Sequence, residues 1–304
     1  MPCRKNPRFN LRRLLRFPLL SVKARPSAAG TTESEVLFEL TGENPENRLF
    51  GRYDAADVRE RLERAGLLRG LSERGYPDPV LVLGCAEPSE QRICLYAGEE
   101  TRERLLLEVR LQLMNFHPRR PIGPFTEESS FRMLVIHWLT LSRPDGDFPL
   151  DRPRLPGQVR PGLGLLSELF ALLSAFSREL SVDGVLDVPD HFHTALFYSR
   201  AFRYLDPAEE GRFQAIARDL AAVPIALASD AIREGCLFDR ATGSPLSWVA
   251  SEQVMSGRGP LRRFLRSEEY RTTRNRALAD LRVVVNWDLY RRKIASRDVV
   301  EKSP

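Results

Sequence analysis

The spacing of hydrophobic residues along the chain predicts helices and strands in a definite order. The first helix is expected between Asp54, which can cap it, and Ser72, because its apolar residues recur every three or four positions. These residues are Val58, Leu62, Ala65 and Leu68. A possible earlier strand at residues 36–40 stands alone in a polar stretch.

Four strands are expected next, at residues 80–86, 92–97, 104–116 and 131–141. In the third, leucine and valine alternate with Glu108, Arg110 and Gln112, which is the period of a strand with one buried face. The fourth is a nearly continuous apolar run that carries one ionisable interior residue, His137. This run is typical of a central strand buried on both faces.

The second half begins with a helix from Leu165 to Leu180, a strand at residues 184–188, a short helix near Tyr198 and a strand that ends at Leu205. Mostly helical segments follow. They are expected at residues 208–223, 224–233, 248–255 and 260–270, and basic residues alternate with apolar ones from residue 271 to residue 293.

A glycine turn opens the helix at Leu165. Its sequence is Pro161-Gly162-Leu163-Gly164, and glycine allows close backbone approach to a ligand. The first N–H groups of a helix have no internal partner, so an anion is the natural ligand there. An ordinary loop before a helix has the same composition, and the turn by itself leaves both readings open.

This order of elements resembles the GNAT superfamily of N-acetyltransferases. In that family, acetyl-CoA is bound by a strand, a loop of the form Q/R-x-x-G-x-G/A, a helix, a second strand and a segment close to N-x-x-A-x-x-x-Y-x-x-x-G-F. Gly162 and Gly164 match the two glycines of the loop, and Tyr198 with Phe202 matches the second segment. The chain departs from the pattern at Val159, which Gln158 and Arg160 flank, and at Ala201, and His191 stands in the place of the asparagine.

The resemblance implies a cofactor site and a general acid. The backbone at Gly162, Leu163, Gly164 and Leu165, with Gln158 and Arg160 beside it, would hold the diphosphate of acetyl-CoA or another acyl-CoA. Tyr198 would protonate the departing thiolate.

The resemblance implies acyl transfer to an unidentified amine by direct attack in a ternary complex. Glu108 and His137 are the candidate bases, because they lie on strands that would approach the cleft. The departures from the pattern favour an alternative, a catalytically inactive GNAT-fold binding or scaffold protein.

Charge is concentrated at the start of the chain. The net charge is +5, yet the first 25 residues hold eight basic residues and no acidic one, so the remainder carries −3. This stretch suggests weak contact with nucleic acid or a membrane surface, or a flexible arm. No run is long enough for a membrane span, and a cytoplasmic protein is expected.

Cysteines and histidines give no metal signature. Cys3, Cys85, Cys94 and Cys236 have no C-x-x-C spacing, and reduced structural thiols are expected. His191-Phe192-His193 could place two imidazoles together, but no third ligand has companion spacing. We therefore expect no metal cofactor.

The predicted fold class is α/β in the α+β sense: a GNAT-like mixed, mostly antiparallel sheet flanked by helices, with a helical C-terminal extension. Residues 1–47 are assigned to a basic tail and linker, 48–206 to the acyl-CoA-binding domain, and 207–304 to the extension. Residues 142–161 form a proline-rich insertion, which acts either as a lid or as a solvated loop. The oligomeric state stays open.

Overall fold

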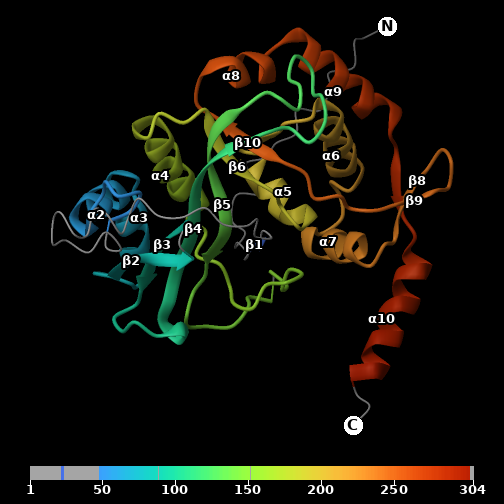
Figure 1. Ribbon diagram of the computed structural model, residues 1–304. Helices are drawn as coiled ribbons and strands as arrows, with labels where there is room; N and C mark the ends of the chain where they lie inside the picture. Colours follow the sequence, from blue (N-terminus) through green and yellow to red (C-terminus); the bar gives the residue numbers. More distant parts are fainter. Residues whose placement is uncertain (1–21, 24–47, 88, 151, 302–304) are drawn as a thin grey trace, which may run out of the picture.

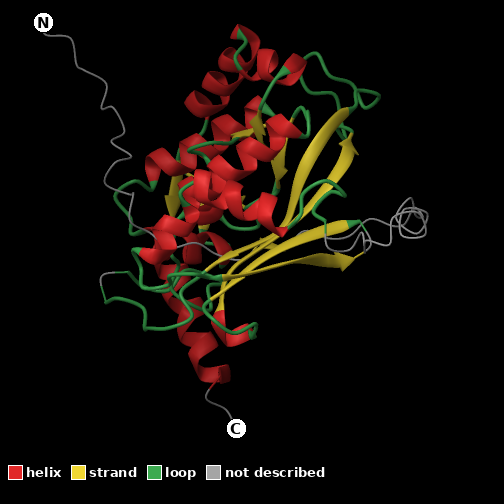
Figure 2. Cartoon of the chain, turned by 90° about the vertical axis from the view of Figure 1, so that its left-hand side faces the viewer, coloured by secondary structure: helices red, strands yellow, loops and turns green. Residues whose placement is uncertain are grey.

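The computed structural model describes residues 22–23, 48–87, 89–150 and 152–301. They form a mixed α and β structure in which the helices gather on one side of the strands (Figure 2). The expected strand at residues 36–40 and nearly all of the basic tail lie outside the described residues. Within the described part of the chain, no helix combines the length and apolar character needed to cross a bilayer.

One large sheet organises the described residues. Its order is β2-β3-β4-β5-β6-β10-β7, and β1 also pairs with β5. The strands are β1 (Val22–Lys23), β2 (Val80–Glu87), β3 (Glu90–Tyr96), β4 (Leu105–Phe116), β5 (Phe131–Leu141), β6 (Gly184–Asp187), β7 (Arg203–Tyr204) and β10 (Gln253–Ser256). The pairing of β5 with β6 is parallel, and the other pairings in this sheet are antiparallel. The predicted mixed, mostly antiparallel sheet is therefore confirmed.

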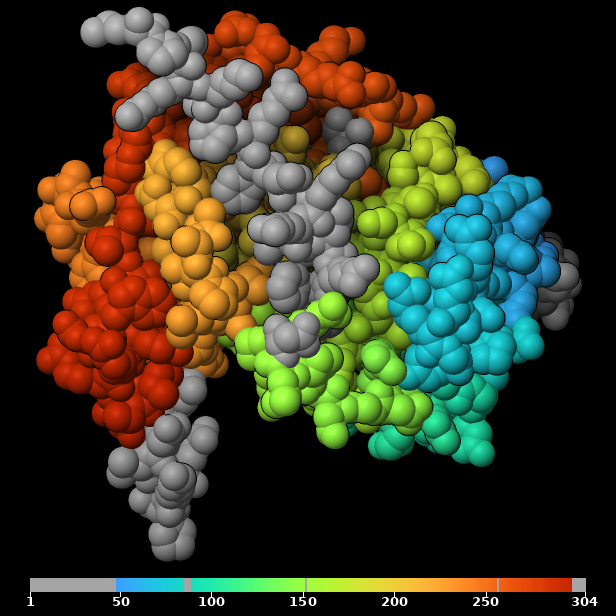
Figure 3. Space-filling model, turned by 180° about the vertical axis from the view of Figure 1, so that it is seen from behind, coloured from blue at the N-terminus to red at the C-terminus, as the bar shows by residue number. Residues whose placement is uncertain are grey.

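Helices pack on this sheet, and further helices form the C-terminal part of the described chain (Figure 1). They are α2 (Ala55–Arg64), α3 (Leu67–Ser72), α4 (Leu166–Glu179), α5 (Phe192–Tyr198), α6 (Pro207–Asp219), α7 (Ile225–Arg233), α8 (Gly259–Leu265), α9 (Glu268–Asp280) and α10 (Trp287–Glu301). A short 3-10 helix, η3 (Arg102–Arg104), precedes β4. Strands β8 (Leu237–Asp239), β9 (Pro245–Leu246) and β11 (Val283–Val285) form a small second sheet. In Figure 3 the C-terminal helices lie at the opposite end of the molecule from α2 and α3.

The first helical hairpin follows from local sequence. Asp54 accepts a hydrogen bond from the N–H of Asp57, and Asp57 accepts one from the N–H of Asp54, which completes a capping box. Gly66, with φ of +81°, ends this helix and divides the predicted segment into α2 and α3.

The two faces of the sheet differ in what covers them. Leu107, Val109 and Leu111 belong to the main hydrophobic core, which the sheet shares with α2, α3 and α4; we call this side the helix face. Met133 and Val135 point the other way and pack with residues of the loop between β4 and β5 and with α8 and α9; we call that side the loop face. Each face therefore has its own core and its own set of polar residues.

Strands β5 and β6 run together for a short distance and then separate. Their pairing covers Met133–Val135 and Gly184–Leu186, whereas β5 continues to Leu141. A β-bulge lies just past this point: Arg110 pairs with Trp138 and Leu111 with Ile136, so His137 is the extra residue of β5 in this pairing. Strand β1 pairs with β5 at Trp138 and Leu139, on the edge from which β6 has separated.

One predicted element is wrong. Residues 248–255 were expected to be helical, but 253–256 form β10, which pairs with β6 on one side and with β7 on the other. The pairing partners decide the conformation of so short a segment, and local sequence does not reveal them. Strand β10 brings residues of the predicted C-terminal extension into the middle of the large sheet.

Gly211 provides a test of the packing between α6 and α9. A Cβ at this position would lie 2.3 Å from the carbonyl oxygen of Arg274 and 2.7 Å from Cβ of Ala277. Gly211→Ala should therefore lower the free energy of unfolding by about 2 kcal/mol or more, because backbone atoms cannot easily move aside. Urea unfolding measures this change. Gly84→Ala, where a Cβ meets no atom within 4 Å, is the matched control and should lose little; equal stability of both variants would contradict this packing.

Candidate functional site

The glycine turn is fastened to the end of β5. The N–H of Arg143 donates to the carbonyl of Pro161 over 2.7 Å, and the N–H of Leu163 reaches the carbonyl of Leu141 over 3.3 Å. Gly164 is exposed and has φ of +69°, a conformation that favours glycine. The turn thus leads directly from the separated end of β5 into α4.

The first N–H groups of α4 lack hydrogen-bond partners among the described residues. Among the described residues, the N–H groups of Gly164, Leu165 and Leu166 have no hydrogen-bond partner, and Leu165 at the N-cap position supplies no side-chain cap. Helix α4 has 14 residues, so its N-terminus carries the partial positive charge of a full helix dipole. An anion would satisfy both the amides and the dipole.

Arg74, which sequence reasoning missed, lies beside this turn. Its Nε donates to the carbonyl of Leu163 over 2.6 Å, and its Nη1 donates to the carbonyl of Gly70 over 2.7 Å. Its Nη2 has no partner among the described residues, and a Cβ added to Gly164 would lie 4.0 Å from it. The site therefore combines uncapped amides with a fixed cation.

Gln158 and Arg160, the polar residues before the turn, hold the insertion in place. The buried Gln158 accepts a hydrogen bond from the N–H of Leu155 over 3.1 Å, and its Nε2 is buried without a partner. Arg160 donates to the carbonyl of Glu103 over 2.8 Å, and Arg154 donates to the carbonyl of Gln158. These bonds make this part of the insertion an ordered segment.

Tyr198 lies in the core, in contact with α4. Its ring meets Phe170 edge-on at 5.2 Å and lies 5.3 Å from Phe202. The side chain is fully buried, and its hydroxyl has no hydrogen-bond partner among the described residues. Burial and the nearby charge of Asp187 raise the pKa of Tyr198 well above its ordinary value, so the phenol keeps its proton at neutral pH.

Polar side chains without partners gather near Tyr198. Asp187 ends β6 and pairs across the sheet with Gln253 of β10; both are fully buried, and their side-chain oxygens and nitrogen have no partner with hydrogen-bond geometry in the described residues. The hydroxyl of Thr194, one helical turn before Tyr198, is also buried and unpartnered. We call Asp187, Thr194, Tyr198 and Gln253 the buried polar cluster.

Asp187 is the most perturbed acid of this cluster. Burial raises its pKa to about 8; the N–H of Val188 lowers it in part, and Asp190 raises it further. Such a carboxyl group holds a proton at neutral pH and can donate a hydrogen bond. Unsatisfied buried polar groups are rare in native proteins, so this cluster is a candidate site.

The two histidines before Tyr198 lie stacked, with ring centres 5.2 Å apart. Burial is the main cause that lowers the pKa of both, and His193 also shares a hydrogen bond of 2.5 Å with Ser229. A Cβ on Gly157 would lie 3.2 Å from Nε2 of His191, so the insertion lies over this point. No group of three or more metal-ligating side chains occurs within the described ranges.

The candidate bases lie on the other face of the sheet. Glu108 alternates with Leu107 and Val109 of the helix-face core, and it pairs with Arg110 over 2.9 Å. His137 shares a hydrogen bond of 2.7 Å with Gln112, which also points to the loop face. The sheet therefore separates both residues from Tyr198.

Comparison of the chain with protein-family models, curated proteins and solved structures gives no match. The site is therefore argued from its geometry. The sequence singles out the turn and Tyr198, and it suggests Asp187 only as a conceivable third ligand beside the two histidines; it does not single out Arg74 or Gln253. Unusual burial of polar groups is the signal that identifies Asp187 and Gln253, and it is visible only in the folded chain.

Asp187→Asn tests the raised pKa. Between its ordinary value of 3.8 and about 8, the folded protein holds a proton on Asp187 that the unfolded chain releases. Wild-type stability should therefore fall as the pH rises through this window, by an amount on the order of a few kcal/mol that the Asn variant lacks. Urea unfolding at about pH 5 and about pH 9 measures the difference. The exposed Asp147→Asn serves as control, and parallel profiles for wild type and Asp187→Asn would contradict the assignment.

Proposed function

We propose that this protein is an acyl-CoA-dependent N-acyltransferase with a GNAT-like site. The observation that carries the proposal is the start of α4, where uncapped N–H groups and the free Nη2 of Arg74 meet at the glycine turn. Diphosphate has the charge and the acceptor oxygens that such a group of donors needs. The acyl-CoA would thus be held by its diphosphate at the N–H groups of Gly164 to Leu166 and by Arg74, whereas the N–H of Leu163 already donates to Leu141.

The arrangement of strands supports the same proposal. The order is strand, glycine turn, helix and parallel strand, and β5 and β6 pair over only three residues before they separate. The bulge at His137 lies next to that separation, and bulges often re-aim groups beside active sites. An acyl-CoA bound at the turn would lie at the end of β5, where β6 has separated and β1 pairs with β5 instead.

Acyl transfer requires one new bond, one broken bond and two proton transfers. The amine of the acceptor attacks the thioester carbonyl, a C–N bond forms, and the C–S bond breaks. Tyr198 gives its proton to the thiolate, and its raised pKa ensures that it holds that proton beforehand. A base removes the proton of the amine; His137 and Glu108 lie on the face of the sheet opposite to Tyr198, so the base stays unassigned.

A second candidate is a GNAT-fold protein that binds acyl-CoA without turnover. Full burial of the Tyr198 hydroxyl favours it, because the acyl group would have to enter the core to meet the phenol. Binding of acetyl-CoA without release of free thiol, in the presence of a panel of primary amines, would select this candidate.

Arg74→Gln tests the diphosphate site. Removal of the cation should weaken acetyl-CoA binding about tenfold, since a charge-assisted hydrogen bond to phosphate contributes roughly 1.5–3 kcal/mol. Isothermal titration measures the affinity. Arg69→Gln, a neighbour on α3 whose side chain is 82% exposed, is the matched control and should bind as wild type does. No heat with acetyl-CoA for the wild-type protein would refute the proposal itself.

Tyr198→Phe tests whether the hydroxyl acts in catalysis, because it removes the hydroxyl and keeps the packing of the ring. The hydroxyl that it removes has no partner, so folding stability should stay equal or rise slightly. Turnover should fall about 100-fold, the usual contribution of a general acid, while the affinity for acetyl-CoA stays nearly unchanged. A stopped assay for free CoA thiol measures turnover. Unchanged turnover would remove Tyr198 from the mechanism.

A further inference from the structure

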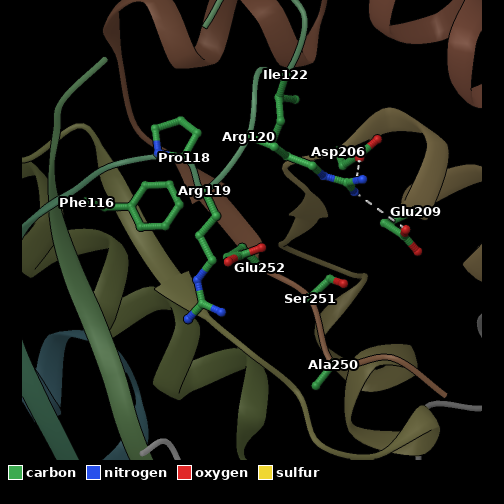
Figure 4. A pocket seen from close by; sticks show the side chains of 10 residues that line it. All are labelled: Phe116, Pro118, Arg119, Arg120, Ile122, Asp206, Glu209, Ala250, Ser251 and Glu252. Atoms are coloured by element: carbon green, nitrogen blue, oxygen red, sulfur yellow. Dashed lines mark hydrogen bonds and ion pairs between the residues drawn. The ribbon is translucent and has the colours of Figure 1, made fainter. Parts of the chain in front are cut away.

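A pocket of about 280 Å³ opens on the loop face of the sheet (Figure 4). Phe116 at the end of β4, the loop that follows it, the start of α6 and the segment just before β10 form its walls. Phe116, Pro118 and Ile122 supply apolar surface, and the other walls are polar or charged. The volume lies near the lower end of the usual range for small-molecule sites, which suits one small metabolite.

Most of the charges in this pocket already neutralise one another. Arg120 pairs with Asp206 at 2.5 Å and reaches Glu209 at 3.7 Å (Figure 4). Asp206 also accepts the N–H of Ala208 as the cap of α6, and Glu209 pairs with Arg212 at 2.5 Å. These charged side chains therefore already have partners within the protein.

Arg119 and Glu252 are different. Both residues line the pocket. Neither side chain has a hydrogen bond or an ion pair within the described residues, and the two side chains do not come within ion-pair distance of each other. A cation and an anion thus remain unpaired on the walls of a small pocket, beside the ring of Phe116 (Figure 4). The ligand that complements such a pair carries a carboxylate and an ammonium group on a small skeleton.

The pocket also lies next to the proposed site. Glu252 directly precedes Gln253, which pairs across the sheet with Asp187 of the buried polar cluster. Since Val254 points to the loop face and alternate residues share a face, Glu252 and Gln253 lie on opposite sides at the edge where β6 ends and β10 begins. A ligand group bound to Glu252 would therefore lie beside Gln253 of the cluster in sequence, on the opposite side of the sheet.

We infer that this pocket binds a free amino acid as the acyl acceptor, with Arg119 on its carboxylate and Glu252 on its ammonium group. Phe116 and Ile122 contact the side chain of the amino acid. The role as acceptor rests on the proposed function, but binding of the amino acid does not.

Titration of the full chain with the proteinogenic L-amino acids, one by one, finds the ligand that binds most tightly. Its methyl ester, which lacks the carboxylate charge, and its N-acetyl derivative, which lacks the ammonium charge, should each bind about tenfold more weakly. The absence of heat with every amino acid would overturn the inference, and so would equal affinity for all three forms of the ligand.

Two variants assign the roles. Arg119→Gln should weaken binding of the free amino acid about tenfold and abolish the preference over the methyl ester, while it retains the preference over the N-acetyl form. Glu252→Gln should give the reverse pattern. A misfolded variant would lose both preferences at once, so the pattern separates recognition from stability. A preference for the free carboxylate that survives in Arg119→Gln would overturn the assignment.

Matched controls remove the same charges elsewhere. Glu127→Gln lies on the exposed part of the same loop, and Arg276→Gln removes a side chain that is 86% exposed on α9; both should bind as wild type does. Titration of acetyl-CoA in parallel distinguishes the two hypotheses. Binding of acetyl-CoA without any amino acid refutes the pocket assignment alone, whereas binding of an amino acid without acetyl-CoA refutes the proposed transferase.

Discussion

The short parallel pairing of β5 with β6 is the constraint on which the rest of the structure depends. Parallel neighbours need a crossover, and α4 with the glycine turn provides it. Because the turn is bonded to the last residues of β5, the N-terminus of α4 must start at the point where the two strands have separated. The position of the uncapped amides is therefore a consequence of the sheet topology, and Arg74, two residues after the end of α3, donates to the carbonyl of Leu163 at the same point.

The buried polar cluster has an energetic cost that the fold alone does not explain. An unpartnered buried donor or acceptor destabilises a protein by about 1–3 kcal/mol, and Asp187, Gln253, Thr194 and Tyr198 contribute several such atoms within neighbouring elements. Apolar residues of similar shape would pack at these positions without that cost. Retention of polar groups here is consistent with a ligand that satisfies them when it binds, and it is the reason that we place the chemistry at this end of β6.

Local patterns predicted most elements, and tertiary contacts decided the rest. The alternation in β4, the apolar run of β5 and the helical spacing of α4 are each encoded in one continuous segment of sequence. The observed bounds of these three elements therefore agree closely with the expected ones. Strand β10 has four residues and gains its conformation from β6 and β7, which no local pattern encodes. For the same reason Arg74 could not be assigned to the turn: the contact spans 89 positions of sequence. The bulge at His137 depends on register with β4 and was equally hidden.

In the proposed reaction, the acid and the candidate bases lie on opposite faces of the sheet. The acid, Tyr198, is held on the helix face, where burial keeps its proton in place. The candidate bases and the pocket with Arg119 and Glu252 lie on the loop face. In the proposed reaction, an acceptor bound on the loop face would have to pass the edge of the sheet before its amine could reach an acyl group beside Tyr198. This separation follows from the alternation of side chains along β4, β5 and β10, because neighbouring residues on one strand must serve opposite faces.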